Sequence, residues 1–288
     1  MFPYHRITLP SEGKAYPAWS ALYKSNGQLL INGLLTRHED QILETGHNPT
    51  TLIEIAKELI VDEEIKSQIY NISLFDFTSL LLAIRIYAYG QEIELISHCN
   101  SCDFNTSIKY NLLANFNNYP FTANEFSCEV SSKLKLTFRQ PTVMDYANGF
   151  NSTFTQMAKT LLLKVDDCPR ESVDFIDNLL AKDCKLIKDA YKTNMYGYDL
   201  SGESVCGHCG EASKLSLSNF TKSLFIFNPA YKKAIHSEVF HLAYASKGGF
   251  QFSDIYNMPC NLRKSYLELL VKQKEDEAKS METANKNA

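Results

Sequence analysis

The pattern of hydrophobic and polar positions predicts helices in the first third of the chain. Residues 73–89 are rich in Leu, Ile and Phe on every side, which is typical of a helix buried in a core, and Gly90 follows as a stop signal. Residues 51–61 place Leu52 and Leu59 on one face of an amphipathic helix. We therefore expect the hydrophobic core to form around these two helices.

Other segments have the periods of strands or helices. The strand period and strand-like composition occur at residues 28–34, 92–97, 106–112, 129–138 and 215–227, the first of them after a Ser-Asn-Gly hairpin turn at residues 25–27. The helical period occurs at residues 36–43, 141–164, 172–192 and 261–274. Thr36 and Glu39 have the spacing of a capping box, so the helix that they begin is expected to present residues 38–40 to solvent.

Composition narrows the class of protein. The chain has 288 residues, 33 acidic and 29 basic, and the net charge of −4 gives no general attraction to phosphate backbones. Its 16 Tyr and 17 Phe suit extensive packing or interface contacts. No apolar run reaches the roughly 20 residues of a membrane span, and the start lacks a secretory signal. We therefore expect a soluble protein that is made and kept in a cytoplasm.

Two Cys-x-x-Cys pairs are the sharpest chemical signal. Cys99 and Cys102 form the first pair, Cys206 and Cys209 form the second, and the same offset of 107 positions aligns the strand-like segments that follow them. A tight turn that carries two thiolates and leads into a strand has the form of a zinc knuckle, and two knuckles supply a tetrahedral Cys₄ site for Zn²⁺. Four thiolates leave no open coordination position, so this pattern predicts a structural zinc.

Three alternatives to zinc remain open at this point. A redox Cys-x-x-Cys normally begins a helix, whereas strands are predicted here, and nothing else indicates the electron transfer of an iron–sulfur cluster. Two unrelated reduced pairs fit the matched flanks less well. His98 and His208 are candidates for substitute ligands, although hydrogen bonding within the turns is the simpler expectation. The remaining cysteines are expected to be free thiols: Cys128, Cys168, Cys184 and Cys260.

The sequence contains no catalytic constellation. A Gly-Lys-Ser/Thr phosphate loop, a Gly-x-Ser-x-Gly elbow and a His-Glu-x-x-His motif are all absent. Arg85 lies within an apolar helix, where a buried, paired arginine or an interface anchor is more common than a catalytic group. We therefore expect a protein without enzymatic activity.

Together these patterns predict an α+β fold, a mixed helical protein with a split Cys₄ zinc-ribbon-like β module and a helical C-terminal region. The expected parts are an N-terminal hairpin and helices (1–98), the split zinc-ribbon module (99–112 with 205–218), an inserted region of strand and helices (113–204) and a C-terminal helical region with a polar tail (219–288).

A series of spaced motifs carries a family resemblance. In chain order they are Leu9-Pro10-Ser11-x-Gly13-x-x-Tyr16, Leu35-Thr36-x-x-Glu39-Asp40, Asn48-Pro49-Thr50, Asp76 with Leu80-Leu81, Ile84-Arg85, Tyr89-Gly90, the first cysteine pair, Phe138-Arg139-x-Pro141-Thr142-x-x-Asp145, Tyr196-Gly197, the second cysteine pair, Phe225-x-Phe227-Asn228-Pro229 and Asp254-Ile255-Tyr256-x-Met258-Pro259. In this order they resemble the baseplate hub protein family of T-even-like contractile-tailed bacteriophages.

The resemblance implies a non-enzymatic structural or assembly component of a contractile phage tail baseplate, either a hub protein or a connector between hub and wedge. Its partners would be other baseplate hub and wedge proteins, rather than a membrane, nucleic acid or a small-molecule substrate. Its location would be the tail baseplate of the virion, and the host cytoplasm during assembly.

A nucleic-acid-binding accessory protein with a zinc ribbon is the alternative function. Four lysines near the predicted strands favour it: Lys133, Lys135, Lys214 and Lys222. The net acidic chain and the absence of a dense basic run weigh against it.

The C-terminal helix carries a further hypothesis. Leu262, Tyr266, Leu269 and Leu270 recur at helical spacing, while residues 281–288 are polar and are expected to fray. Packing of this stripe on its own domain is the commoner arrangement. A terminal helix with a charged opposite face can instead dock on a neighbouring subunit, and we favour docking in baseplate assembly.

Overall fold

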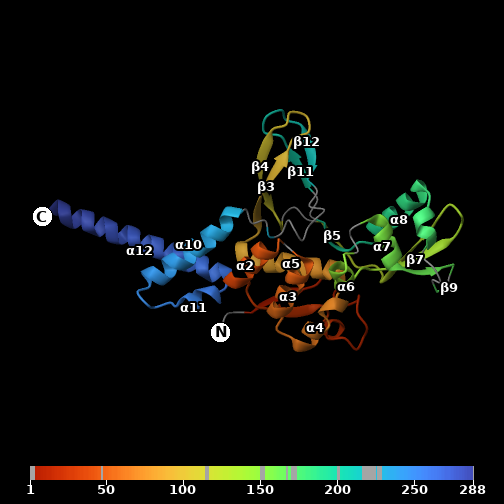
Figure 1. The fold of residues 1–288 in the computed structure, drawn as a ribbon, viewed down its shortest axis with the longest axis horizontal. Helices are drawn as coiled ribbons and strands as arrows, with labels where there is room; N and C mark the ends of the chain where they lie inside the picture. The colour runs from red at the N-terminus through yellow and green to blue at the C-terminus, as the bar shows by residue number, and fades with distance from the viewer. Residues whose placement is uncertain are drawn as a thin grey trace.

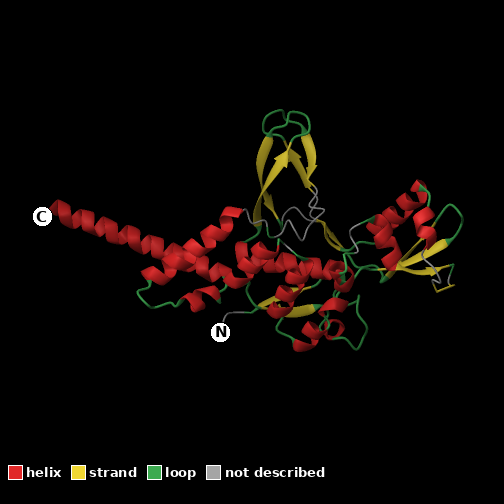
Figure 2. Ribbon diagram, viewed as in Figure 1, coloured by secondary structure: helices red, strands yellow, loops and turns green. Residues whose placement is uncertain are grey.

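The computed structural model describes residues 4–46, 48–113, 117–149, 153–166, 168–169, 174–199, 202–215, 225 and 229–287. It combines helices and strands, so the predicted α+β class is confirmed (Figure 2). A central helical body carries a β module that projects from one side, a lobe of strands and helices at one end, and a group of C-terminal helices at the other (Figure 1).

The central body is built around α5 (Leu74–Tyr89), the long apolar helix expected at residues 73–89. Phe77, Leu80 and Leu81 on this helix are buried, and Gly90 ends it with a φ of 83°. Around α5 lie β1 (His5–Thr8), α1 (Ala21–Lys24), β2 (Gln28–Ile31), α2 (Thr36–Thr45), α3 (Pro49–Leu59), α4 (Glu63–Ser67), the 3-10 helix Ile69–Asn71 and α6 (Val143–Ala147). The helix expected at residues 51–61 is α3, and its predicted apolar face is buried.

The variant Leu81→Asp is expected to be insoluble, because it places a charge without a partner in the apolar core. The measurement is the soluble fraction of the expressed protein after cell lysis. Leu180→Asp is the matched control, since Leu180 is 59% exposed and the same substitution there desolvates no charge. Equal solubility of the two variants would contradict the assignment of α5 to the core.

The tight hairpin expected at residues 25–27 is wrong. β2 pairs antiparallel with β1, and the chain between them forms a long excursion that includes α1. Two stretches of this excursion lie in backbone contact: Leu9 N–H donates to the carbonyl of Gly27 at 2.9 Å, and a Cβ on Gly13 would lie 2.5 Å from the carbonyl oxygen of Leu22. Glycine is therefore required where the two stretches cross, and the Ser-Asn-Gly sequence at residues 25–27 supplies one of the two glycines at the crossing.

The carboxylate of Asp76 on α5 explains the Leu-Pro-Ser-x-Gly-x-x-Tyr motif. Asp76 accepts hydrogen bonds from the backbone N–H of Ser11 at 3.0 Å, from the Ser11 hydroxyl at 2.5 Å and from the Tyr16 hydroxyl at 2.6 Å. Burial raises the pKa of Asp76, and these donors oppose the rise by stabilising the ionised form. The motif therefore anchors the N-terminal segment to the core helix.

The lobe departs most from the sequence-based expectations. It contains the antiparallel sheet β6 (Glu125–Glu129), β7 (Lys135–Arg139), β8 (Leu162–Val165) and β9 (Cys168–Pro169), together with α7 (Phe154–Leu161), the 3-10 helix Asp174–Asn178 and α8 (Ala181–Thr193). A two-stranded pair, β5 (Asn117–Tyr119) with β10 (Gly197–Asp199), leads back toward the body.

Three predicted elements of the lobe are wrong in extent. The single strand at residues 129–138 is instead the last residue of β6, a turn and most of β7, because Lys133 adopts a φ of 65° and the carbonyl of Val130 accepts its N–H in a tight turn. The helix at 141–164 is divided into α6 and α7 and ends in β8, where Leu162 pairs with Phe138. The helix at 172–192 is a short 3-10 helix followed by α8.

The C-terminal helices are α10 (Pro229–Ala245), α11 (Phe252–Tyr256) and α12 (Cys260–Asn287). Most of the segment expected to be strand-like at 215–227 lies outside the described residues. α12 continues beyond residue 274 and through the tail that was expected to fray. In the described part of the chain, no helix is both long and apolar enough to cross a membrane.

The first half of α12 packs on its own chain. Tyr266 and Leu270 contact a cluster of buried residues on α10 and α11 that includes Val239 and Ile255, whereas Leu269 is exposed. The docking hypothesis is therefore wrong for this stripe, which belongs to the fold. Only the distal half of α12 extends away from the body (Figure 1).

A buried ionic network fastens α12 to the body. Arg263 is completely buried and donates to the carboxylate of Glu39, to Glu238 at 2.9 Å and to the hydroxyl of Thr36 at 2.8 Å. Residues 38–40, which include Glu39, were expected to face solvent, and all three are buried. The capping box centred on Thr36 is also wrong. Leu35 is the N-cap residue, and Thr36 instead bonds the carbonyl of Met258.

Arg85 on α5 is buried and hydrogen-bonded, which agrees with the expectation of a buried arginine that has partners. Its guanidinium donates to the carbonyl of Gly90 at 3.0 Å and to the carbonyl of Glu92 at 3.1 Å, and it lies 4.8 Å from the centre of the Tyr89 ring. It therefore satisfies carbonyl groups where the chain leaves α5 and enters the projecting module.

Candidate metal centre

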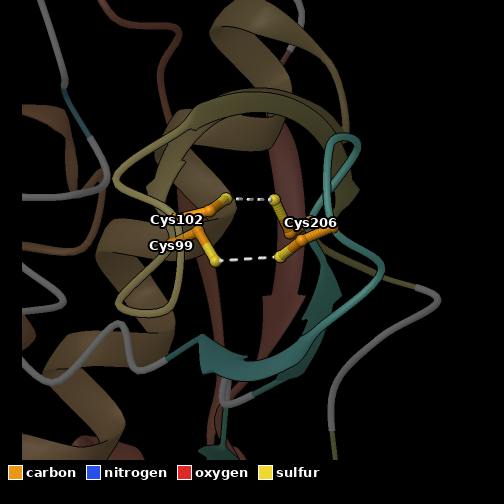
Figure 3. Close-up of side chains that lie close together, drawn as sticks. Cys99, Cys102 and Cys206 are labelled. Carbon is orange, nitrogen blue, oxygen red and sulfur yellow. Dashed lines mark hydrogen bonds between the residues drawn. The ribbon is translucent and has the colours of Figure 1, made fainter.

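Four cysteine thiols meet at the tip of the projecting module. The module consists of two antiparallel hairpins, β3 (Glu92–His98) with β4 (Asn105–Asn111) and β11 (Gly202–Val205) with β12 (Ala212–Leu215). Cys99 and Cys102 lie in the first hairpin loop, and Cys206 and Cys209 lie in the second. All four sulfur atoms lie within 4.8 Å of one another. Figure 3 shows Cys99 and Cys102 facing Cys206 across the space between the loops.

The two hairpins repeat one another at the offset of 107 positions seen in the sequence. Ser97 pairs with Thr106 in the first hairpin, and Ser204 pairs with Ser213 in the second, so the registers are equivalent. The strands predicted at residues 92–97 and 106–112 are confirmed as β3 and β4, whereas β12 ends at Leu215, where the segment predicted at 215–227 begins.

The loops are also equivalent in backbone geometry. The N–H of Asp103 donates to the carbonyl of Cys99 at 2.9 Å, and the N–H of Gly210 donates to the carbonyl of Cys206 at 3.0 Å. Both donors have a left-handed backbone, with φ values of 57° and 74°. Asp and Gly tolerate this conformation better than most residues, which lets each loop turn two thiols toward one point.

The sulfur spacing matches a tetrahedral metal site. Cys99 and Cys209 have their sulfur atoms 3.6 Å apart, and so do Cys102 and Cys206. A Zn–S bond of about 2.3 Å gives a tetrahedron with edges of about 3.8 Å. A disulfide requires about 2.05 Å, so these are four separate thiols. The residues therefore fit a Cys₄ metal centre.

Polar side chains hold the hairpins together below the cysteines. The hydroxyls of Ser97 and Ser204 lie 3.1 Å apart, and Ser204 lies 2.7 Å from the hydroxyl of Ser213. The N–H of Gly207 donates to Thr106 at 3.1 Å. The sequence interpretation missed these residues, although the same offset of 107 links Ser97 to Ser204 and Thr106 to Ser213. These contacts are hydrogen bonds between small polar groups, so a shared metal would add to the stability with which the hairpins are held together.

The thiols are not electrostatically equivalent. Backbone N–H groups of Cys209 and His208 donate to Cys206 and lower the pKa of its thiol to about 6. At Cys102, the hydrogen bond from Phe104 lowers the pKa, but burial and the neighbouring thiols outweigh it and raise the pKa to about 12. A metal ion would displace protons from these thiols on binding, with Cys206 ionised most readily.

The two neighbouring histidines have partners of their own. His98 lies 3.1 Å from the side-chain oxygen of Asn105, and the ring of His208 stacks on Phe104 at 5.4 Å. Both residues are therefore engaged within the loops. Strands follow both cysteine pairs, so neither pair has the helix N-terminus that activates a redox motif.

The remaining described cysteines, and two of the four lysines that favoured nucleic-acid binding, lie outside the module. Cys128, Cys184 and Cys260 are free thiols outside the cluster, and the side chain of Cys168 lies outside the described residues. Lys133 and Lys135 belong to the β6–β7 hairpin of the lobe. These two lysines are therefore remote from the cysteine pairs, whereas Lys214 lies on β12 within the module and Lys222 lies outside the described residues. Half of the lysines that favoured nucleic-acid binding thus do not lie on the cysteine module.

Comparison with known proteins identifies one family. The family model described as T4 bacteriophage base plate protein matches residues 1–225, which include the central body, the lobe and all four clustered cysteines. No curated protein and no solved structure matches the chain.

Proposed function

Because the chain belongs to the T4 bacteriophage base plate protein family, a structural component of the phage tail, we propose that it serves in the baseplate hub or connects hub to wedge. The observation that supports this proposal is the family match across the body, the lobe and the module together. The protein interacts with other baseplate proteins, and we propose hub and wedge subunits as those partners. The role requires no enzymatic activity and begins in the host cytoplasm during assembly.

The shape of the molecule supports a connecting role. The β module, the lobe and the distal part of α12 extend from the central body in different directions (Figure 1). Projecting elements allow one small chain to contact several neighbours, as a connector must. The rigid attachment of α12 by Arg263 and of the N-terminal segment by Asp76 would fix the directions of these contacts.

We propose that Zn²⁺ binds Cys99, Cys102, Cys206 and Cys209 as a structural staple. Zinc favours four thiolates in a tetrahedron, and such a site has no open position for a reacting water. The metal would join hairpins that are more than 100 positions apart in the chain. It would therefore fix the two hairpins to one another without taking part in a reaction.

Deleting the gene from the phage that encodes it tests the baseplate role. Infected cells are expected to contain no complete baseplates in electron micrographs, and expression of the chain from a plasmid should restore both baseplates and infectious particles. Cross-linking mass spectrometry of baseplates then identifies hub or wedge neighbours. Normal tails and full infectivity without the protein would overturn the proposal, as would cross-links confined to non-hub, non-wedge components.

A further inference from the structure

The N-terminus of α5 lies where three segments of the chain meet. Tyr16 reaches it from the N-terminal segment, and Tyr196 reaches it from the segment between α8 and β10, which returns from the lobe. The ring of Tyr196 packs edge-on against Phe75 of α5, with centroids 5.0 Å apart. A Cβ on the next residue, Gly197, would lie 3.4 Å from Cγ of Pro10. The lobe and the N-terminal segment are therefore both joined to α5 at this place.

Two buried hydroxyl groups at this place lack a partner. Ser73 is the N-cap residue of α5 and is 6% exposed, yet its hydroxyl forms no capping hydrogen bond. Tyr196 is 3% exposed. Neither hydroxyl forms a hydrogen bond of ordinary length and angle with a group in the described part of the chain. Buried hydroxyls in folded proteins are nearly always hydrogen-bonded, either to protein or to ordered water, so these two groups require a ligand.

The carboxylate of Asp76, in the first turn of α5, has an acceptor position left. Its Oδ2 accepts the hydroxyls of Ser11 and Tyr16, whereas its Oδ1 accepts the backbone N–H of Ser11. A carboxylate offers about four acceptor positions, so Oδ1 can accept a further donor. Burial and the negative charge of Asp76 raise the pKa of Tyr196, as expected when the Tyr196 hydroxyl lies near this carboxylate. A donor and an acceptor are thus available at one buried place.

We propose that one buried water molecule binds at the N-terminus of α5, between the hydroxyls of Ser73 and Tyr196 and the carboxylate of Asp76. The water accepts the hydrogen bond of the Tyr196 hydroxyl and donates to Oδ1 of Asp76 and to the Ser73 hydroxyl. Three hydrogen bonds are usual for a buried water. The charge of Asp76 repels an anion, and a metal cation would find a single charged ligand here. The water links the segment that returns from the lobe to the carboxylate that anchors the N-terminal segment.

The stability of the variant Tyr196→Phe tests the water site, because the presence or absence of a partner changes the sign of the effect. If the hydroxyl binds a water, its removal loses a hydrogen bond, and the full-length variant should unfold at a lower urea concentration than the wild type. Removing a buried hydroxyl that has no partner would instead leave the midpoint unchanged or raise it, and either result would overturn the proposal. Tyr119→Phe is the matched control, since Tyr119 is 46% exposed on the neighbouring strand β5 and its hydroxyl can bind solvent in any case.

Crystal structures of the full-length wild type and of Tyr196→Phe, at a resolution that shows ordered water, separate the water from a direct hydrogen bond. The wild type should show one water about 2.7–3.2 Å from the Tyr196 hydroxyl, from Asp76 and from the Ser73 hydroxyl. In Tyr196→Phe that water should be displaced or lost. A Tyr196 hydroxyl bonded directly to Asp76 or Ser73 with no water between them would overturn the proposal, as would a ligand with the short contacts and higher coordination number of a metal cation.

Discussion

Replacing Cys206 by serine is expected to abolish stoichiometric metal binding and to lower stability by several kcal/mol. The wild-type protein, purified without added zinc, should contain about one zinc per chain by elemental analysis. Backbone N–H groups of its own loop lower the pKa of the Cys206 thiol to about 6, and its sulfur lies 3.6 Å from that of Cys102. Because serine cannot replace this ligand, the metal-dependent part of the folding energy is lost.

Cys184→Ser provides the control for this experiment. Cys184 is a free, partly buried thiol on α8, remote from the cluster, so its replacement should retain the metal and near-wild-type stability. A native wild-type protein that contains no metal, and in which all four clustered thiols react with a thiol reagent, would contradict a metal centre. Full metal content in the Cys206→Ser variant would contradict the ligand assignment.

Replacing Arg263 by methionine is expected to destabilise the protein by about 3–5 kcal/mol. The substitution preserves much of the side-chain volume but leaves the completely buried carboxylate of Glu39 without its cation. The hydroxyls of Tyr89 and Tyr231 donate to Glu39 at 2.6 and 2.9 Å, and they cannot neutralise its charge. Urea unfolding followed by circular dichroism measures the loss.

The double variant Arg263→Met with Glu39→Gln tests the cause of this loss. Because it removes both charges, it should recover much of the stability lost by Arg263→Met alone. Lys274→Met is the control, since Lys274 forms only an exposed pair with Glu277 on the same helix. If Arg263→Met unfolds at the wild-type urea concentration, the ionic network contributes nothing to the attachment of α12.

The cluster of four cysteines was largely predictable because its pattern is local and repeated. Each Cys-x-x-Cys loop closes through its own backbone, and the offset of 107 residues predicted that two equivalent loops exist. The polar contact between Ser97 and Ser204 was not predictable from either hairpin alone. It arises only when the two hairpins meet, and serines in a strand are otherwise typical of a solvated face.

The lobe was less predictable because alternation of hydrophobic and polar residues does not indicate where one strand ends and the next begins. The alternating residues at 129–138 include the end of β6, the turn after it and most of β7, so the alternation runs across a turn. The helical pattern at 141–164 likewise contained a segment that joins the sheet as β8. In both cases the neighbouring strand, rather than the local pattern, determined the element.

The sequence by itself determined the core helix α5 and the paired cysteine loops, because their patterns depend on burial along one element or on bonds within one loop. The tertiary structure alone decided the role of Glu39. Its spacing from Thr36 predicts a helix cap on a solvated face, yet the side chain is buried against Arg263, 224 positions away. A carboxylate is stable there only because a distant helix brings a guanidinium to it, and no local pattern contains that partner.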